Sequence, residues 1–363
     1  MLVIVKGIKM KILLTGSTGF IGSYVLKYLI YEGQSVNVLV RDKSKIFNSN
    51  HPGLNIYEGN INDADAIIRA TEGCDVIIHL AALVQTTSKH PEDFYTINYR
   101  GTENLLKAAK QCRVKRFIFT SSLSACTYVP MPVIGEDSLV RPKKCFSDYA
   151  ESKAMAEQLV KDYSDKNLHY TIIYPASVFG IGPLTDANEA TKALSLYLKN
   201  RLPFLIDCGE QFSNWAFVED IARGIVSAVS GNYVNQRYIL GGENKTLKDV
   251  YDIADRISGK KHLRINLKSK MAEKLVWLIE TSAKLSGSHP LITQEWLKFL
   301  LQSQKLSSGK AVLELNYRIT PIEVALEKTL TWLKKSSEIQ IQSQRLKILK
   351  STKITADSEL AGY

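Results

Sequence analysis

The chain has 363 residues, of which 45% are hydrophobic and 23% charged, and its 47 basic and 36 acidic residues give a net charge of +11. This composition is typical of a soluble globular protein that is long enough for two domains and a sizeable core. The longest apolar run, VIIHLAALV, is far too short to cross a bilayer, so we expect no integral membrane span.

Cysteine and histidine usage narrows the class of protein further. The five cysteines are scattered and form no C-x-x-C pair, and the six histidines show no ligand spacing. We therefore expect no metal site, no disulfide framework and a cytoplasmic location. The positive charge admits a nucleic-acid or anionic-membrane partner, but no zinc finger or interleaved aromatic and basic motif supports one. We favour a basic enzyme with an anionic cofactor and a small-molecule substrate, without nucleic acid.

The first half of the chain alternates β-branched runs with amphipathic stretches. Residues 1–9 are interpreted as a short extension rather than a signal peptide. Strands are predicted at 11–16, 35–40, 55–60, 75–81, 116–122 and 169–175, and helices at 20–32, 96–112 and 149–162. Continuously apolar strands between helices indicate a parallel sheet covered on both faces. Right-handed crossovers then leave an α/β fold with the doubly wound Rossmann sheet as the main candidate.

After Pro175 the alternation of strands and helices is less regular. Helices are predicted at 188–199 and 217–230, a strand at 237–242, and a mostly helical stretch at 246–332 with breaks near 287–290 and 307–309. We assign residues 10–175 and 212–243 to a dinucleotide-binding domain, 176–211 and 244–335 to a smaller, mostly helical substrate-binding region, and 336–363 to a polar, flexible tail. Met271, Trp277 and Trp296 are expected to shape or cover the substrate pocket. The amphipathic segment 271–285 is also compatible with a membrane surface.

A glycine-rich loop, TGSTGFIG, directly follows the first predicted strand. Its glycines, Gly16, Gly19 and Gly22, suit a tight turn and a close backbone approach to a pyrophosphate at a helix N-terminus. The second strand ends in VLVRDKSK, where Arg41 would accommodate the 2′-phosphate of NADP, whereas Asp42 leaves NAD open. We therefore predict NADP(H) as cofactor, with NAD as the alternative.

The stretch YAESK places Tyr149 and Lys153 one helical turn apart, a spacing that occurs by chance as well. The spacing becomes significant because other motifs precede and follow it in a defined order. The chain resembles the extended short-chain dehydrogenase/reductases, also called the NAD-dependent epimerase/dehydratase family, from about residue 10 to residue 332. Within this family it looks most like dihydroflavonol 4-reductase-like and 3β-hydroxysteroid dehydrogenase-like members. The motifs that carry the resemblance are TGSTGFIG, HLAA, INYRGTENLL, TSS, YAESK, YPASVFGIGP, FVEDIARG and NYRITPIEVALEKTLTWL.

The resemblance implies roles for individual residues. Tyr149 would be the general acid/base, Lys153 its partner, Ser122 the group that binds the substrate oxygen, and Asn98 a structural or proton-relay residue, with Ser121 and Ser124 as alternatives to Ser122. His79 is expected to be a packed strand residue. A homodimer is a further implication. The implied cofactor site consists of Gly16, Thr18, Gly19, Phe20, Ile21, Gly22, Arg41, Asn60, Ile61, Leu80, Ala81, Ala82, Thr120, Tyr149, Lys153, Pro175, Ser177 and Val178.

Reduction of a carbonyl needs a hydride on carbon and a proton on oxygen. A free tyrosine has a pKa of about 10, and a lysine ammonium one turn away, together with the positive oxidised nicotinamide, should lower it. The chain departs from the family pattern at Asn60, where Asp is usual beside the adenine. It departs again at Tyr174 and Phe179, in a motif that nucleotide-sugar members write R-P-x-x-V-Y-G, which weakens a sugar-nucleotide substrate.

The sequence therefore predicts an NADP(H)-dependent oxidoreductase that reduces a ketone, or oxidises a secondary alcohol, of a small and fairly apolar molecule. The alternatives are a nucleotide-sugar epimerase or dehydratase with tightly bound NAD, and a cofactor-binding protein without turnover. The intact Ser122, Tyr149 and Lys153 argue against the last of these. The sequence predicts neither the individual substrate nor the direction of the reaction.

Overall fold

The computed structural model describes residues 9–46, 48–85, 90–128, 131–231, 233–286 and 293–336. Its central feature is a seven-stranded sheet in the order β12-β8-β5-β4-β1-β2-β3, in which all neighbouring strands are parallel. The strand order reverses between β1 and β4, so the predicted doubly wound Rossmann sheet is confirmed. The strands are β1 (Lys11–Thr15), β2 (Ser35–Val40), β3 (Leu54–Glu58), β4 (Val76–His79), β5 (Arg116–Thr120), β8 (His169–Pro175) and β12 (Gln236–Leu240).

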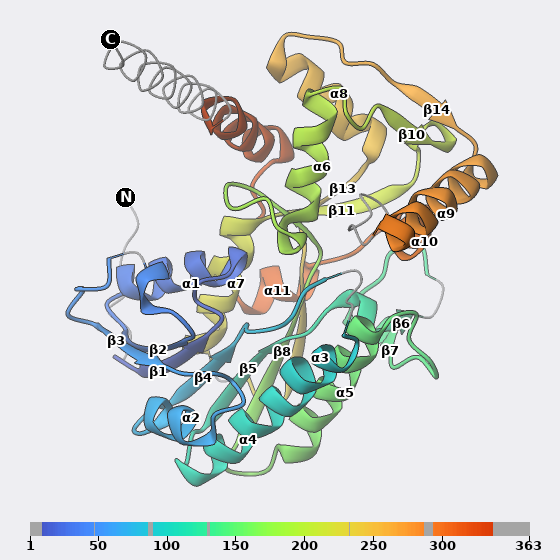
Figure 1. Cartoon of the computed structure of the whole chain (residues 1–363). Coiled ribbons are helices and arrows are strands. Elements are labelled where there is room, and N and C mark those ends of the chain that lie inside the picture. Colours follow the sequence, from blue (N-terminus) through green and yellow to red (C-terminus); the bar gives the residue numbers. More distant parts are fainter. Residues whose placement is uncertain are drawn as a thin grey trace, which may run out of the picture.

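Helices cover both faces of this sheet (Figure 1). On one face α1 (Phe20–Tyr31) packs beside α7 (Val218–Ser230), and on the other lie α2 (Ala64–Thr71), α4 (Gly101–Gln111) and α5 (Asp148–Tyr163). Along β1 the side chains alternate between two apolar clusters, since Ile12 and Leu14 belong to the first and Leu13 to the second. Because helices cover both faces of the sheet, side chains on both sides of the central strands are buried, and these strands are largely apolar instead of alternating between apolar and polar residues.

Helix α5, which carries the YAESK stretch, begins at a well-defined cap. The Ser147 side chain accepts a hydrogen bond from the backbone N–H of Ala150, 3.2 Å away, and Asp148 and Glu151 lie in the first turn, where acidic groups suit the helix dipole. The helix predicted at 96–112 is longer and less regular. It comprises α3 (Glu92–Phe94), a π-helical turn η2 (Tyr95–Arg100) and α4.

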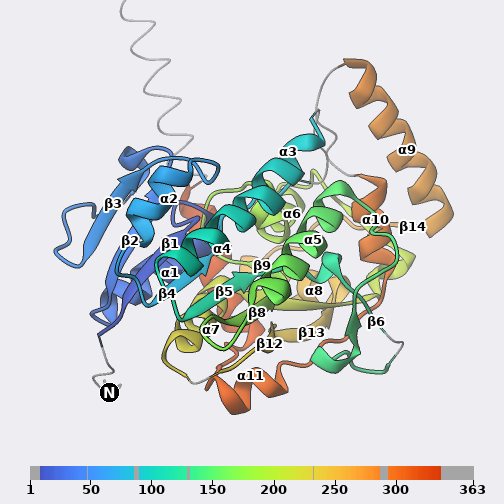
Figure 2. The same cartoon turned by 90° about the horizontal axis from the view of Figure 1, so that it is seen from below.

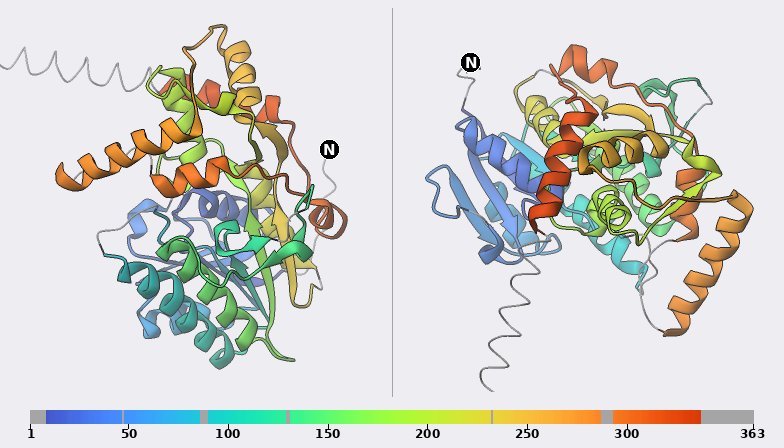
Figure 3. Two further views of the ribbon diagram at one scale, coloured as in Figure 1. Left: turned by 90° about the vertical axis from the view of Figure 1, so that its right-hand side faces the viewer. Right: turned by 90° about the horizontal axis from the view of Figure 1, so that it is seen from above.

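A second layer of elements lies over the carboxyl ends of the strands (Figures 1 and 3). It contains a three-stranded sheet in the order β13-β11-β9 and a parallel pair of β10 with β14. Apolar residues of α6, β11, α8 and residues 322–336 form its core. Its elements are β9 (Ser177–Phe179), α6 (Glu189–Leu198), β10 (Phe204–Ile206), β11 (Phe212–Phe217), β13 (Glu243–Thr246), α8 (Leu247–Ser258), β14 (Ile265–Leu267), α9 (Ser269–Ser286), α10 (Gln294–Leu301) and a helix at 322–336.

Smaller elements complete the described chain. The strands β6 (Thr127–Tyr128) and β7 (Leu139–Val140) pair with each other, and α11 (Gly309–Glu314) lies against β12 (Figure 2). Short 3₁₀ turns are η1 (Lys43–Lys45), η3 (Leu123–Ala125), η4 (Glu136–Ser138), η5 (Asp186–Asn188) and η6 (Asp207–Gly209).

Several predicted boundaries change in the structure. The strands β3, β4 and β5 each end two residues before their predicted ends, because the chain turns away at the cofactor loops, and the 246–332 stretch begins at the last residue of β13 and contains β14. The predicted break at 287–290, most of the extension at 1–9 and the tail from residue 337 lie outside the described residues. Among the helices described, none has the length and apolar character that a membrane span requires.

Candidate active site

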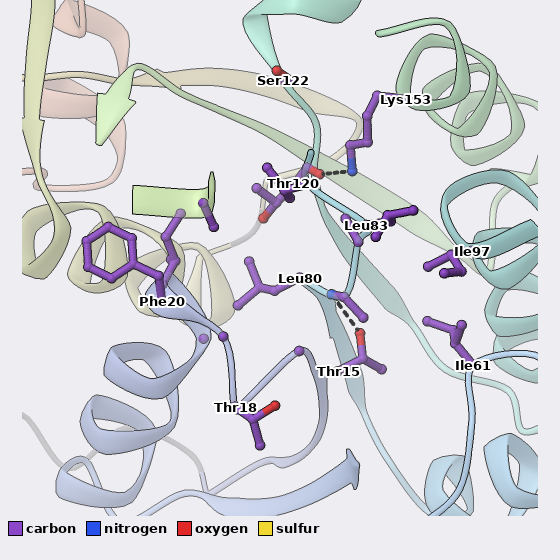
Figure 4. Close-up of a pocket in the computed structure, with 18 of the residues that line it drawn as sticks. Thr15, Thr18, Phe20, Ile61, Leu80, Leu83, Ile97, Thr120, Ser122 and Lys153 are labelled. Carbon is purple, nitrogen blue, oxygen red and sulfur yellow. Dashed lines mark hydrogen bonds between the residues drawn. The ribbon is translucent and has the colours of Figure 1, made fainter. Parts of the chain in front are cut away.

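A cavity of about 420 Å³ lies at the carboxyl ends of the central strands, where the strand order reverses (Figure 4). This edge is where open α/β sheets bind their ligands. All of the predicted cofactor residues except Ser177 and Val178 line it. Those two residues lie in β9 and line a neighbouring cavity instead.

The glycine loop leaves no room for side chains. Gly16 has a φ of 77°, and a Cβ there would lie 2.6 Å from the backbone nitrogen of Ala81, two residues after the end of β4. A Cβ on Gly22 would lie 2.0 Å from the carbonyl oxygen of Gly16. Glycine is therefore required for the loop to close against β4 while its backbone borders the cavity.

Helix α1 begins inside this loop. Gly19 precedes the first turn, so no side chain caps the helix, and Gly19, Phe20, Ile21 and Gly22 all line the cavity. Uncapped backbone N–H groups at a helix N-terminus favour an anion. The glycine cradle and this helix start together fit the pyrophosphate of a dinucleotide.

Two charged residues follow β2, and they differ in what they offer to the cavity. Arg41 is exposed and lines the cavity. The Asp42 carboxylate is engaged by its own turn, since it accepts hydrogen bonds from the backbone N–H of Ser44 at 3.0 Å and from the Ser44 hydroxyl at 2.6 Å. These hydrogen bonds lower the pKa of Asp42. Of these two residues, Arg41 therefore lies at the cavity and Asp42 does not. Asn60 and Ile61 border the same cavity.

Lys153 lies at the base of the cavity, with only 4% of its surface exposed. Its Nζ donates a hydrogen bond to the carbonyl oxygen of Thr120 at 2.6 Å and lies 4.3 Å from the centre of the Phe119 ring (Figure 4). Burial lowers the pKa of Lys153 to about 7, and the Glu157 carboxylate opposes this shift. The lysine can therefore change its charge near neutral pH.

Tyr149 lines both this cavity and the neighbouring one. Burial raises its pKa, a hydrogen bond with Ser122 lowers it, and the charge of Glu189 raises it. From the sequence, Lys153 was expected to lower the pKa of Tyr149. In the protein alone the net direction is upward, because burial outweighs the hydrogen bond and also destabilises the charge on the lysine.

The two serines that follow β5 have different partners. The buried Ser121 hydroxyl donates a hydrogen bond to the Glu157 carboxylate at 2.7 Å. The Ser122 hydroxyl lies 2.8 Å from that of Ser124, and Ser122 lines both cavities together with Tyr149. Of the two serines, Ser121 thus borders the first cavity only, whereas Ser122 borders both.

Asn98 lines neither cavity, although it lies close behind the first. It is buried in the π-helical turn, and its side chain accepts from the backbone N–H of Leu83 at 2.7 Å. Its amide nitrogen donates to the Leu83 carbonyl at 3.2 Å and to the Ser152 hydroxyl at 3.0 Å. Asn98 therefore connects the loop after β4 to α5. Such a π-helical turn is often found at functional sites.

His79 is also a packing residue. It is 1% exposed, and its ring nitrogens lie 2.8 Å from the Thr15 hydroxyl and 2.9 Å from that of Thr102. Burial holds the pKa of His79 well below its usual range. Among the described residues, no group of three or more His, Cys, Asp and Glu side chains could hold a metal ion.

The neighbouring cavity has a volume of about 300 Å³ and adjoins the first at Ser122, Tyr149 and Pro175. Sequence reasoning missed most of its wall, including Glu189, Trp215 and Tyr251. The pKa of Glu189 is raised to about 7, chiefly by burial and secondarily by Asp186. The only sequence signal for Glu189 is an acid in the first turn of the helix predicted at 188–199.

Comparisons with known proteins show the family of the chain. The NAD dependent epimerase/dehydratase family profile matches residues 12–241. The chain is 26% identical over 334 residues to a Synechocystis protein assigned as a dihydroflavonol 4-reductase, covering 90% of this chain and 96% of that protein. It is 28% identical over 227 residues to the 3 beta-hydroxysteroid dehydrogenase/Delta 5-->4-isomerase of Mycobacterium tuberculosis, covering 61% of this chain and 60% of that protein.

A solved structure shares the fold over the same range. The UDP-glucose 4-epimerase of Thermotoga maritima superposes with a TM-score of 0.72 at 21% identity, covering 90% of this chain and 99% of that one. The chain belongs to the NAD dependent epimerase/dehydratase family and is an NAD(P)-dependent oxidoreductase of the extended short-chain dehydrogenase/reductase type.

Proposed function

We propose that the protein is an NADP(H)-dependent reductase or dehydrogenase that interconverts a ketone and a secondary alcohol. The observation that supports this most directly is the position of Tyr149 and Ser122. Both residues line the cavity that fits a dinucleotide and the separate cavity beside it. A carbonyl held in the second cavity would thus meet a proton donor at the boundary with the cofactor.

The nicotinamide cofactor, when bound in the first cavity, supplies a hydride to the carbonyl carbon or accepts one from the alcohol. The Tyr149 hydroxyl donates its proton to the substrate oxygen, so that hydride and proton together give the alcohol. The Ser122 hydroxyl donates a hydrogen bond to the same oxygen, and donors of this kind are typically worth about 3 kcal/mol in the transition state. A protonated Lys153 stabilises the tyrosinate that remains. Asn98 acts as a positioning residue through Leu83 and Ser152.

The charged residues after β2 favour NADP over NAD in this proposal. Arg41 lines the cavity, whereas the Asp42 carboxylate is held by Ser44 and does not line it. A guanidinium pairs well with a 2′-phosphate, and a free carboxylate would be needed to hold a 2′-hydroxyl.

A nucleotide-sugar epimerase or dehydratase is the alternative, since the family also includes such enzymes. The lining of the second cavity argues against it. Among the described residues of this lining, Asp186 and Glu189 are the charged groups, and neither Lys nor Arg is present. A sugar diphosphate would find no basic side chain in this lining to pair with its charge, whereas a neutral and largely apolar ketone needs none.

The decisive measurement is made on the purified protein. We expect NADPH to bind, to be oxidised in the presence of a ketone, and to bind equally well to Tyr149→Phe, which would not turn over. Tightly bound NAD that survives purification, together with binding of UDP, would instead support the epimerase. The homodimer, the cytoplasmic location and the assignment of residues to two domains stay predictions.

A further inference from the structure

A third cavity, of about 170 Å³, continues from the second one away from Tyr149. Asp186, Glu189 and Ala193 line both cavities, so the two meet along one side of α6. The remaining wall comes from β10, β14, α9 and α10, which lie together in the second layer (Figures 1 and 2). The first, second and third cavities therefore follow one another from the glycine loop to α9.

The third cavity is lined mainly by hydrocarbon. Leu196, Phe204 and Val276 are typical of its wall. The charged groups, apart from the two shared acids, are the partly buried Lys192 and the exposed Arg201. Lys192 is paired with Asp186 at 3.4 Å, so its charge has a partner outside any ligand. The interior of this cavity consequently favours an uncharged, apolar occupant.

The junction between the second and third cavities is formed by small and polar side chains. Glu189 and Ala193 lie four residues apart in α6, on the same side of the helix. Ala193 contributes only a methyl group, which leaves the passage open. No side-chain hydrogen bond of Glu189 is found among the described residues, so its carboxyl group is available to a ligand that passes this point.

The second and third cavities are open to solvent on one side, so their apolar walls are exposed to water unless a ligand covers them. Two adjoining and largely apolar cavities, the nearer of them lined by Tyr149, are typical of a binding site for an apolar ligand. We propose that the third cavity binds the hydrocarbon tail of the substrate, so that the substrate is an elongated ketone or secondary alcohol rather than a small one. Glu189 then lies beside the middle of the molecule, where it meets a hydroxyl or other hydrogen-bond donor if the substrate carries one. This inference rests on the proposed function for the identity of the reacting end.

The experiment measures binding and turnover separately, with methyl ketones that share one reacting end. The dissociation constants of 2-hexanone, 2-octanone, 2-decanone and 2-dodecanone are measured by titration calorimetry on the full chain saturated with NADP⁺. We expect each added methylene to tighten binding about fourfold, the equivalent of ~0.8 kcal/mol, until the third cavity is full. Dissociation constants that do not depend on chain length would overturn the inference.

The variant Ala193→Phe places a ring in the junction. It should remove the gain for longer chains, so that the affinity for 2-dodecanone falls at least tenfold more than the affinity for 2-hexanone. Ala64→Phe, the same change at an exposed position in α2, is the matched control and should keep the wild-type series. An unchanged series in Ala193→Phe would contradict the proposal.

A second variant covers the case in which Ala193→Phe does not fold. Leu196 lines the third cavity and not the second, so Leu196→Ala enlarges the tail site alone. We expect the longest ketone that still gains affinity to be at least two carbons longer than in the wild type. An identical chain-length limit would contradict the proposal.

NADPH oxidation with the same ketones tests the proposed function independently. Binding that depends on chain length without any oxidation of NADPH would remove the reductase assignment and leave the tail site standing. Oxidation of NADPH together with affinities that do not depend on chain length would support the reductase assignment and overturn the tail site.

Discussion

The carboxyl group of Glu189 and the phenol of Tyr149 line the same cavity, and a negative charge on Glu189 raises the pKa of the tyrosine. The two residues come from different parts of the fold, α6 and α5. Because the pKa of Glu189 is itself raised to about 7, this influence on the catalytic tyrosine depends on pH.

Glu189→Gln removes that charge. Above pH 7 the wild-type carboxylate is ionised and disfavours the tyrosinate, so the variant should form the tyrosinate at a lower pH. We expect the rise of kcat/KM for alcohol oxidation to move down by roughly half a unit to one unit. Profiles of kcat/KM against pH measure this shift, with Glu327→Gln at an exposed position as the control. A profile identical to the wild type would show that the two groups are not coupled.

Lys153→Met tests the energetic effect of a buried lysine in the protein without cofactor. The pKa of Lys153 is about 7 in the folded protein and about 10.4 in an unfolded chain, so between these values the unfolded state binds more protons. The free energy of unfolding should therefore rise with pH from 7 toward 10, by up to about 1.4 kcal/mol per unit from this group.

The variant should lack this contribution and have a flatter dependence on pH. Urea unfolding of wild type and variant at pH 7, 8 and 9 gives the difference, with Lys199→Met at an exposed position as the control. Parallel curves for the wild type and Lys153→Met would mean that the buried lysine keeps an ordinary pKa.

Ser122→Ala and Ser121→Ala are neighbouring changes with opposite expectations. The first removes a hydroxyl at the junction of the two cavities and should lower kcat by about 10² to 10³ with little change in stability. The second removes the donor to Glu157 and should reduce the free energy of unfolding by about 1 kcal/mol, with kcat altered less than tenfold. Steady-state kinetics and urea unfolding of both variants test this assignment. A large loss of kcat in Ser121→Ala, with a loss of stability alone in Ser122→Ala, would show that the two roles were assigned to the wrong serines.

Arg41→Ala tests the cofactor preference. Loss of the guanidinium beside a 2′-phosphate should raise the KM for NADPH by about 10- to 100-fold, the equivalent of ~1.4 to 2.7 kcal/mol, and leave that for NADH nearly unchanged. Lys43→Ala, in the exposed turn two residues further on, is the matched control. Equal effects on both cofactors would point to a general role in folding of the loop rather than to recognition of the phosphate.

The central sheet could be predicted because its strands are buried on both faces, and such strands are read as continuous apolar runs. The strands β9, β11 and β13 could not be predicted in the same way. They have three to six residues each and depend on pairing between distant segments, such as Trp215 with Ser177 on one side and Glu243 on the other. Local sequence contains little of this information.

The residues of the candidate site likewise fall into those that could be predicted from the sequence and those that could not. The residues in motifs, such as Gly16 and Tyr149, come from loops and helices next to the parallel strands, and the structure brings them to one cavity. Glu189 belongs to no motif, and only the packing of the second layer places it beside Tyr149. The expectation that Lys153 and the oxidised nicotinamide lower the pKa of Tyr149 left out burial, which raises it, because burial is a property of the whole fold.

The position of β12 has a consequence for the synthesis of the protein. This strand forms the edge beside β8, and residues 176–235, which contribute to the second layer, precede it in the chain. Until the ribosome has added residue 240, the nascent chain has an open edge at β8, where Ile172 and Tyr174 are fully buried in the finished protein. Such an edge pairs readily with another chain. Fragments that end at Pro175 are therefore expected to aggregate, and a chain expressed as two separate fragments should be divided after β12 rather than before it.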